Sequence, residues 1–217
     1  MASVVLARIE PNKYGSYVLG QLLEPNLITP YKNLNCLNAL SICPGPAASV
    51  LQRSLVEQNT SLLRELFYLI SAVRNPTTVN AVEKSLRSQH LWERANAVEA
   101  LESLTAPKTA ALITPLMDPD QPSQVPMTLA NHDWDIACFT PSAAIKVLLS
   151  EGNIAWQRVL AASVLPELSE SLNQTSRVEI EELIRQAQID PDLDVQLELR
   201  PGMDRKWISR IGRIQPI

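Results

Sequence analysis

A short pattern that is written twice constrains this chain more than any other feature of the sequence. Residues 91–104 read LWERANAVEALESL, and residues 155–168 read AWQRVLAASVLPEL. Five positions agree at a constant offset of 64 residues: Trp92, Arg94, Ala97, Leu101 and Leu104 recur as Trp156, Arg158, Ala161, Leu165 and Leu168. The apolar members follow helical spacing, so the pattern predicts the same amphipathic helix twice.

A repeated helix of this kind predicts repeated helical pairs. A shorter apolar-periodic segment precedes each copy, and a further segment follows it. One pair cannot bury its apolar face alone, whereas stacked pairs can, so the repetition favours a solenoid. The offset exceeds one repeat unit by roughly 20 residues. Residues 118–141 account for that excess, and their four prolines and missing period predict an insertion loop.

Composition agrees with an all-α fold. The 217 residues are 46% hydrophobic but include only six glycines and 5% aromatic residues, fewer of both than a large β-sheet protein needs. Sixteen prolines indicate short helices that end often. The net charge of −4 favours neither nucleic acid nor an anionic membrane as a partner.

The chain shows no signal for export, membrane insertion or metal binding. Its N-terminal residues, MASVVLARIE, lack the basic region of a signal peptide, and the longest apolar run, at 66–73, is far shorter than the ~20 residues of a membrane span. The odd number of cysteines (Cys36, Cys43 and Cys138) argues against a disulfide framework and suits a reducing compartment. We therefore expect a cytoplasmic protein without metal or cofactor.

The predicted organisation has five parts. In order, they are a partly helical N-terminal segment at 1–30, helical pairs at 31–117, the insertion loop at 118–141, helical pairs at 142–189, and a C-terminal tail or cap at 190–217. Pro25 and Pro30 predict a loop over 24–33. Asn59, Thr60 and Ser61 are predicted to cap a helix that starts near residue 62.

Two stretches resemble HEAT repeats, the helical pairs of armadillo-like solenoids. LRSQHLWERANAVEAL and LLSEGNIAWQRVLAASVL each have a first helix ending in Leu-x-Ser, a short turn, and a second helix with an early Arg and an Ala/Leu-rich face. The run LLRELFYLISAVRNPTTVNAVEKSLRS, with ERANAVEALESL and PKTAALITPLMD, resembles the HEAT-rich soluble segment of bacterial proteins related to ATP/ADP translocases. This resemblance covers residues 31–170.

The resemblance implies a short right-handed HEAT-type α-α solenoid, an armadillo-like superhelix of about four to five helical pairs. In the larger bacterial proteins the segment accompanies a membrane transporter-like portion and a cyclic-nucleotide-binding domain. This sequence matches neither, so transport and nucleotide binding are not carried over. The HEAT-like phycobilin lyases share the fold class, but no motif in this sequence selects them.

The repeated polar and aromatic positions have structural and functional interpretations. Arg94 and Arg158 are expected to form inter-repeat or turn-capping ion pairs, because a guanidinium group suits several carbonyl or carboxylate acceptors. Trp92 and Trp156 are expected to hold the turn against the core. Contact with a ligand is the alternative for all four residues.

Residues 132–135, HDWD, are the most chemically suggestive stretch. A histidine beside acids can bind a metal or act as a base, but a base also needs a partner and a pocket, and the sequence indicates neither. Motifs for serine hydrolases, P-loops and dinucleotide binding are absent. We therefore predict no catalytic residue, and expect Trp134 and Phe139 to anchor a partner.

The C-terminal residues are basic and amphipathic. Trp207, Ile208, Ile211 and Ile214 form an apolar stripe beside Arg210 and other basic residues. A cap on the end of the solenoid, a tail that binds a partner and a membrane-surface helix all remain open.

We therefore expect a bacterial, non-catalytic scaffold or adaptor whose HEAT-repeat surface binds another protein, in a multi-subunit or membrane-associated complex. Two alternatives stay open: an accessory enzyme of the phycobilin-lyase type, and a soluble regulatory fragment of a larger transporter-like membrane protein. The residues expected to contact the partner lie on the second helices, in the loop and in the tail: Glu93, Asn96, Glu99, Gln157, Ser163, Trp134, Phe139, Trp207 and Arg210.

Overall fold

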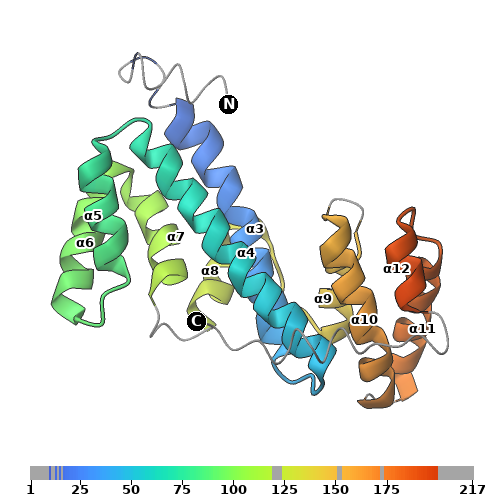
Figure 1. Cartoon of the computed structure of the whole chain (residues 1–217). Coiled ribbons are helices and arrows are strands. Elements are labelled where there is room, and N and C mark those ends of the chain that lie inside the picture. The colour runs from blue at the N-terminus through green and yellow to red at the C-terminus, as the bar shows by residue number, and fades with distance from the viewer. Residues whose placement is uncertain are drawn as a thin grey trace. The chain divides into compact units, whose positions relative to one another are not determined.

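The computed structural model is helical throughout the part of the chain that it describes, residues 10, 13, 15, 17–118, 124–150, 153–171 and 174–199 (Figure 1). The predicted all-α class is confirmed for these residues. The elements in chain order are the π-helix η1 (Val18–Leu23) and the α-helices α3 (Glu24–Leu40), α4 (Pro46–Ser71), α5 (Pro76–Leu86), α6 (Leu91–Leu104), α7 (Pro107–Met117), α8 (Gln124–Trp134), α9 (Pro141–Leu148), α10 (Ala155–Ser171), α11 (Gln174–Gln188) and α12 (Leu193–Glu198).

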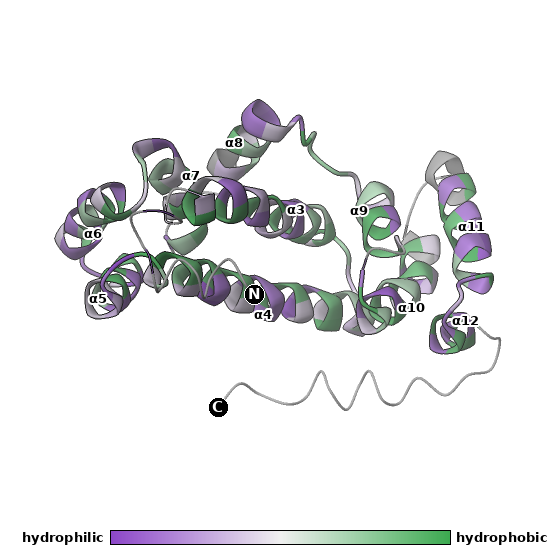
Figure 2. Cartoon of the chain, turned by 90° about the horizontal axis from the view of Figure 1, so that it is seen from above, coloured by the Kyte–Doolittle hydropathy of each residue, from purple (hydrophilic) through white to green (hydrophobic). Residues whose placement is uncertain are grey.

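The chain divides into two compact units. The first comprises Met1–Leu34 and Gln58–Ala137, and the second comprises Asn35–Glu57 and Cys138–Ile217. In the first unit α5 contacts α6, α6 contacts α7, and α7 contacts α8. In the second unit each helix from α9 to α12 contacts the next one, and α10 also contacts α12. Many of the helices carry both hydrophilic and hydrophobic residues, as helices that bury one face do (Figure 2).

Prolines and polar caps define where many of these helices begin. The first residues of four helices are proline: Pro46 in α4, Pro76 in α5, Pro107 in α7 and Pro141 in α9. A proline is tolerated there because the first N–H groups of a helix have no intrahelical acceptor. The side chain of Asn75 caps α5 by accepting from the Thr77 amide at 2.9 Å, and Thr140 caps α9 by accepting from the Ala143 amide at 3.2 Å.

The loop predicted at 24–33 is wrong, because α3 occupies these residues. Pro25 is the second residue of α3, which directly continues the π-helix η1. Pro30 lies inside the helix and is buried in the first unit. Its carbonyl accepts a hydrogen bond from Asn59 Nδ2 at 3.1 Å, so a side chain of α4 binds the backbone of α3 beside the proline.

The predicted helix start at residues 59–61 is also wrong, since α4 runs through these positions. Asn59 is buried, and its Oδ1 accepts from Asn33 Nδ2 at 2.9 Å. Asparagine usually weakens a helix interior because its side chain competes for nearby backbone groups. Here α3 supplies hydrogen-bond partners for both the oxygen and the nitrogen of the Asn59 side-chain amide, so this side chain is accommodated inside α4 and does not cap a new helix.

The segment predicted as an insertion loop contains helix α8. Pro126 is its third residue and therefore lies in the first turn, where proline is compatible with a helix. Pro126, Met127 and Ala130 are buried, and they give α8 an inward face. The prediction of an irregular loop is therefore wrong for residues 124–134.

Tyr31 connects three helices of the first unit. Its ring is fully buried on α3 and lies 5.1 Å from the ring of Trp134 on α8, tilted by 55°. Its hydroxyl donates a 2.7 Å hydrogen bond to the carbonyl of Leu112 on α7. Burial raises the pKa of this hydroxyl strongly, and the nearby carboxylate of Asp133 raises it further.

The core of the second unit surrounds α10. Every residue from Gln157 to Leu165 is buried, which is more than two turns of helix with no exposed position. The cluster includes small side chains that allow close helix packing, among them Ala39, Ala47, Ala48, Ala144, Ala161, Ala162 and Ala187, together with Leu51, Leu55, Ile145, Leu160, Leu168, Ile180 and Leu183. Cys36 and Cys43 belong to the same core as free thiols.

A carboxylate of α10 caps the N-terminus of α4 in this unit. Glu167 Oε1 accepts from the Ala47 amide at 2.9 Å, and Oε2 accepts from the Ala48 amide at 3.1 Å. A negative charge at this position also interacts favourably with the helix dipole. Gly45, directly before α4, has φ of +129°, and an added Cβ would overlap the carboxylate of Glu167.

We predict that Gly45→Ala destabilises the protein by at least about 1–3 kcal/mol, the usual cost of a strained backbone, with the displaced carboxylate adding to it. Urea denaturation followed by circular dichroism measures the loss. Gly20→Ala is the matched control, because a Cβ there meets no described atom outside its own helix within 4 Å. Equal stability of the two variants would contradict the capping role of Gly45 and Glu167.

We predict that Tyr31→Phe costs about 1–3 kcal/mol at neutral pH, since the Leu112 carbonyl loses its buried donor. The pKa of Tyr31 is raised in the folded state, so its contribution is complete below about pH 10 and declines as the pH rises further. The stability difference between wild type and Tyr31→Phe should therefore shrink above that pH. Urea midpoints of both proteins between pH 8 and pH 11 test this, and a constant difference would refute it.

Candidate functional site

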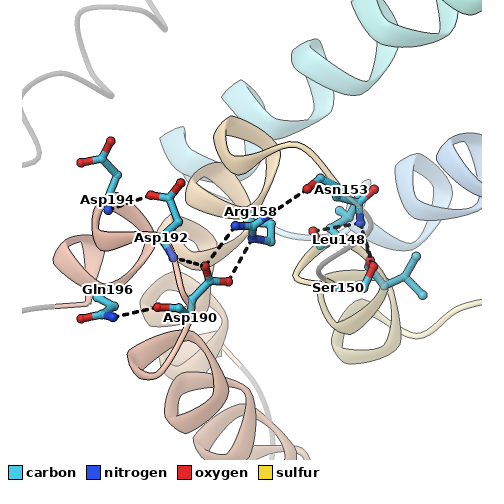
Figure 3. Close-up of polar contacts among 9 residues, drawn as sticks. Leu148, Ser150, Asn153, Arg158, Asp190, Asp192, Asp194 and Gln196 are labelled. Atoms are coloured by element: carbon cyan, nitrogen blue, oxygen red, sulfur yellow. Dashed lines mark hydrogen bonds and ion pairs between the residues drawn. The ribbon is translucent and has the colours of Figure 1, made fainter.

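The two repeated arginines make closely similar contacts, each inside its own unit. Arg158 donates from Nε to Asp190 Oδ2 at 3.0 Å, from Nη2 to Asp190 Oδ1 at 3.1 Å and from Nη1 to the Asn153 carbonyl at 2.7 Å (Figure 3). Arg94 donates from Nη1 to the Ser88 carbonyl at 2.8 Å, and its Nε lies 3.6 Å from Asp118 Oδ1. In both copies the guanidinium therefore joins the turn before its own helix to an aspartate that follows the next long helix.

Further hydrogen bonds order the surroundings of Arg158. Asp190 Oδ1 also accepts from the Asp192 amide at 2.8 Å, and the Asp190 carbonyl accepts from Gln196 Nε2 at 2.7 Å (Figure 3). Asn153 Nδ2 donates to the Val147 carbonyl at 2.7 Å. Buried charges need partners of this kind. The donors of the Arg158 guanidinium named above bind the two turns, so they do not face a ligand.

The tryptophans of the repeat do not lie in the core. Trp92 is 65% exposed and Trp156 is 47% exposed, whereas the interpretation from sequence placed both against it. They are the second residues of α6 and of α10, one position after each helix begins. An exposed tryptophan is a large apolar surface of the kind that binding sites use.

The predicted contact residues separate into an exposed group on α6 and a buried group on α10. Asn96 and Glu99 are exposed, and Glu93 is half-buried with its carboxylate accepting from the Ser88 hydroxyl. The predicted outward positions of Gln157 and Ser163 are wrong, because both are buried. Helix α10 is packed by α9, α11 and α12, so the position that is open on α6 is covered on α10.

The predicted aromatic anchors face inward. Trp134 is half-buried against Tyr31 in the first unit. Phe139 packs against the core of the second unit, and its amide donates to Asn35 Oδ1 at 2.9 Å. His132 is exposed, and its Nδ1 lies 3.2 Å from Asp133 Oδ1. Trp207 and Arg210 lie outside the described residues.

A groove along α5 and α6 of the first unit has a volume of about 820 Å³. Its lining comes from both helices and includes Ala81, Lys84, Trp92, Asn96, Ala97 and Ala100. Among the contact residues predicted from sequence, Glu93 and Asn96 line this groove, and Trp92 is a repeat position found in it. Ala81, Lys84 and Ala100 also line the groove and were not predicted to do so, although Ala97 and Ala100, three residues apart on α6, indicate a face that allows close approach.

We compared the described residues with the requirements of a metal site and of a reactive thiol. No group of three or more histidine, cysteine or acidic side chains within metal-binding reach occurs among them. Burial, with a smaller effect of Glu167, raises the pKa of the Cys43 thiol, which disfavours its thiolate form. In the searched part of the chain, no helix combines the length and apolar character that crossing a membrane requires.

We predict that Asp190→Ala destabilises the protein by about 3–5 kcal/mol, since Arg158 is left as an uncompensated buried charge. Asp118→Ala should cost less, because Arg94 is as buried as Arg158 but the Asp118 side chain is 24% exposed, so water can replace part of the lost contact, whereas the Asp190 side chain is 6% exposed. Denaturant midpoints of the two variants give the comparison. Equal losses would show that the two arginine pairs contribute alike.

Comparison with family models, with curated proteins and with solved structures gives no match to this chain.

Proposed function

We propose that this protein is a non-catalytic adaptor that binds a helix of another protein in the groove between α5 and α6. The observation that carries the proposal is the open, largely apolar groove with a mostly exposed tryptophan at one end. Monomeric proteins rarely leave such a surface without a use, and aromatic anchors in grooves dominate the energetics of many interfaces.

The composition of the groove favours a helical partner. Ala81, Ala97 and Ala100 form part of its lining, and small side chains allow a backbone to approach closely. Trp92 then offers a flat apolar contact for one or two large residues of the incoming helix. An amphipathic helix that presents leucine or methionine at i, i+3 and i+7 suits this arrangement.

Charges on the rim favour an acidic flank on that helix. Lys84 is exposed on the rim. Other rim charges already have internal partners, because Arg87 lies 3.5 Å from Glu83 and Glu93 accepts from Ser88. Lys84 is thus the cation that an acidic residue of the partner would meet, and this pairing would set orientation more than affinity.

The architecture behind this proposal is a HEAT-type solenoid. Its support is the similar arginine contact in both copies of the repeat and the packing of successive helices within each unit, from α5 to α8 and from α9 to α12. In such folds a side of the stacked helices remains open to partners. The three cysteines form no disulfide with one another, which suits a reducing compartment, so we propose a cytoplasmic location.

We predict that Asn96→Arg, or Ala100→Arg, abolishes capture of the partner, because a long cation fills the groove. Affinity purification of the tagged protein from its native cell, with mass spectrometry, identifies proteins that wild type retains and these variants lose. Trp92→Ala should lower the affinity for a purified partner about tenfold or more. Glu102→Lys is the matched control, since Glu102 is exposed on the same helix but outside the groove lining.

The proposal fails if the groove variants keep every partner that wild type and Glu102→Lys keep. It also fails if Trp92→Ala and Trp156→Ala weaken binding equally, because Trp156 occupies the same repeat position in the other unit. Thermal melts of each variant exclude unfolding as the cause.

A further inference from the structure

In the second unit, the short helix α12 packs beside the buried arginine of α10. It contacts both α10 and α11. The amide of its N-cap residue, Asp192, donates to the carboxylate of Asp190, which also binds Arg158 (Figure 3). Val195 of α12 is fully buried and belongs to the same core cluster as Val159 of α10. A short helix that inserts one aliphatic side chain therefore closes this part of the second unit.

The corresponding face of α6, in the first unit, is much more exposed. At the offset of 64 residues, Ala95 and Val98 correspond to Val159 and Ala162 of α10. Ala95 is exposed and Val98 is half-buried, whereas Val159 and Ala162 are 7% and 0% exposed. Leu91, which helical spacing places on the same face as Ala95 and Val98, is 75% exposed. The face that is covered on α10 is thus open on its copy.

The open face borders a hollow of about 220 Å³. Its lining includes Leu91, Ala95, Val98 and the ion pair of Arg94 and Asp118, the counterpart of the pair that lies beside α12. Pockets for small molecules usually measure about 300–1,000 Å³, so a hollow of this size suits single side chains of a peptide better.

The sequence after the aspartate explains why this chain does not supply such a side chain itself. Residues 118–120 and 190–192 both read DPD. The second copy continues with LDV, which begins α12 and contains its buried valine, whereas the first copy continues with QPS. The first copy therefore repeats the cap sequence and lacks the aliphatic residues that follow it.

We propose that this hollow is a second docking site, and that its occupant is a short helix of another protein with the pattern of α12. In α12 the N-cap Asp192 is followed three residues later by Val195, and Leu199, four residues further on, packs against the same core. The partner helix accordingly has a polar cap residue and two aliphatic residues at these spacings, which share one face. Its first aliphatic side chain enters the hollow beside Asp118. A carboxylate can accept several donors, so Asp118 can also bind an amide at the start of that helix.

This site is separate from the groove between α5 and α6. Ala95 and Val98 line the hollow, whereas Asn96 and Ala100 line the groove. Successive residues of a helix point about 100° apart, so the neighbours Ala95 and Asn96 can face different sites. A bulky residue at one of these two positions should block one site and leave the other open, and the second site does not depend on the proposed function.

Titration of the isotope-labelled full-length protein with a synthetic peptide of residues 191–199 tests the proposal by NMR. This peptide is the sequence that closes the corresponding face of the second unit. It is only partly helical when free, so the titration extends to roughly 5 mM, which detects a Kd of about 1 mM. The amide signals of Ala95, Val98 and Thr114 should shift and reach saturation.

Substitutions on adjacent residues of α6 then assign the site. Ala95→Arg fills the hollow and should weaken peptide binding about tenfold or more. Leu91→Asp removes apolar surface from the same site and should act likewise, in a first turn that favours an acidic residue. Asn96→Arg is the matched control and should leave the affinity within about twofold of wild type. Circular dichroism of each variant excludes unfolding as the cause.

A peptide with Val195→Asp is the second control and should not shift these signals. The proposal is overturned if the unchanged peptide gives no saturable shift, or if both peptides give the same one. Shifts at Val159 and Ala162 instead would mean that the peptide displaces α12, and equal weakening by Ala95→Arg and Asn96→Arg would place it in the groove. Either result also overturns the proposal. Loss of peptide binding in Ala95→Arg alone supports the second site, whatever the groove variants do to other partners.

Discussion

The burial of residues 157–165 of α10 is the constraint on which the second unit depends. A helix that is covered on all sides from Gln157 to Leu165 needs apolar or small residues around its whole circumference, and its neighbours must supply matching faces. Alanines on α9, α10 and α11 let the helices approach, and leucines and isoleucines fill the space that remains. Helices α9, α11 and α12 are each positioned by this one central element.

Polar groups then determine where the turns lie. Arg158 and Glu167 both project from α10, and each satisfies backbone or side-chain groups of another segment. A buried guanidinium or carboxylate is costly without partners, so each tolerates only a narrow range of turn geometries. Arg94 repeats the arrangement in the first unit, where the arginine is equally buried but its aspartate is more exposed.

The difference in exposure between α6 and α10 underlies the proposed function. Helix α6 shares its sequence pattern with α10 but keeps one side open, and on that side Trp92 and several alanines line a groove. A helix that is fully covered serves stability, whereas its partly covered copy is free to bind.

The sequence alone determined that the chain is helical, that one helix occurs twice, and that the arginine of the pattern has a structural position. Each of these depends on local periodicity or on a chemical group with few stable environments. The tertiary structure decided the rest. Pro30 and Asn59 read as breaks, yet each lies within a helix because they meet across α3 and α4. Gln157 and Asn96 both look like surface residues, but only the neighbours of each helix decide that Gln157 is buried and Asn96 exposed. Burial depends on which elements from elsewhere in the chain pack against a helix. The spacing of residues within that helix does not identify those elements.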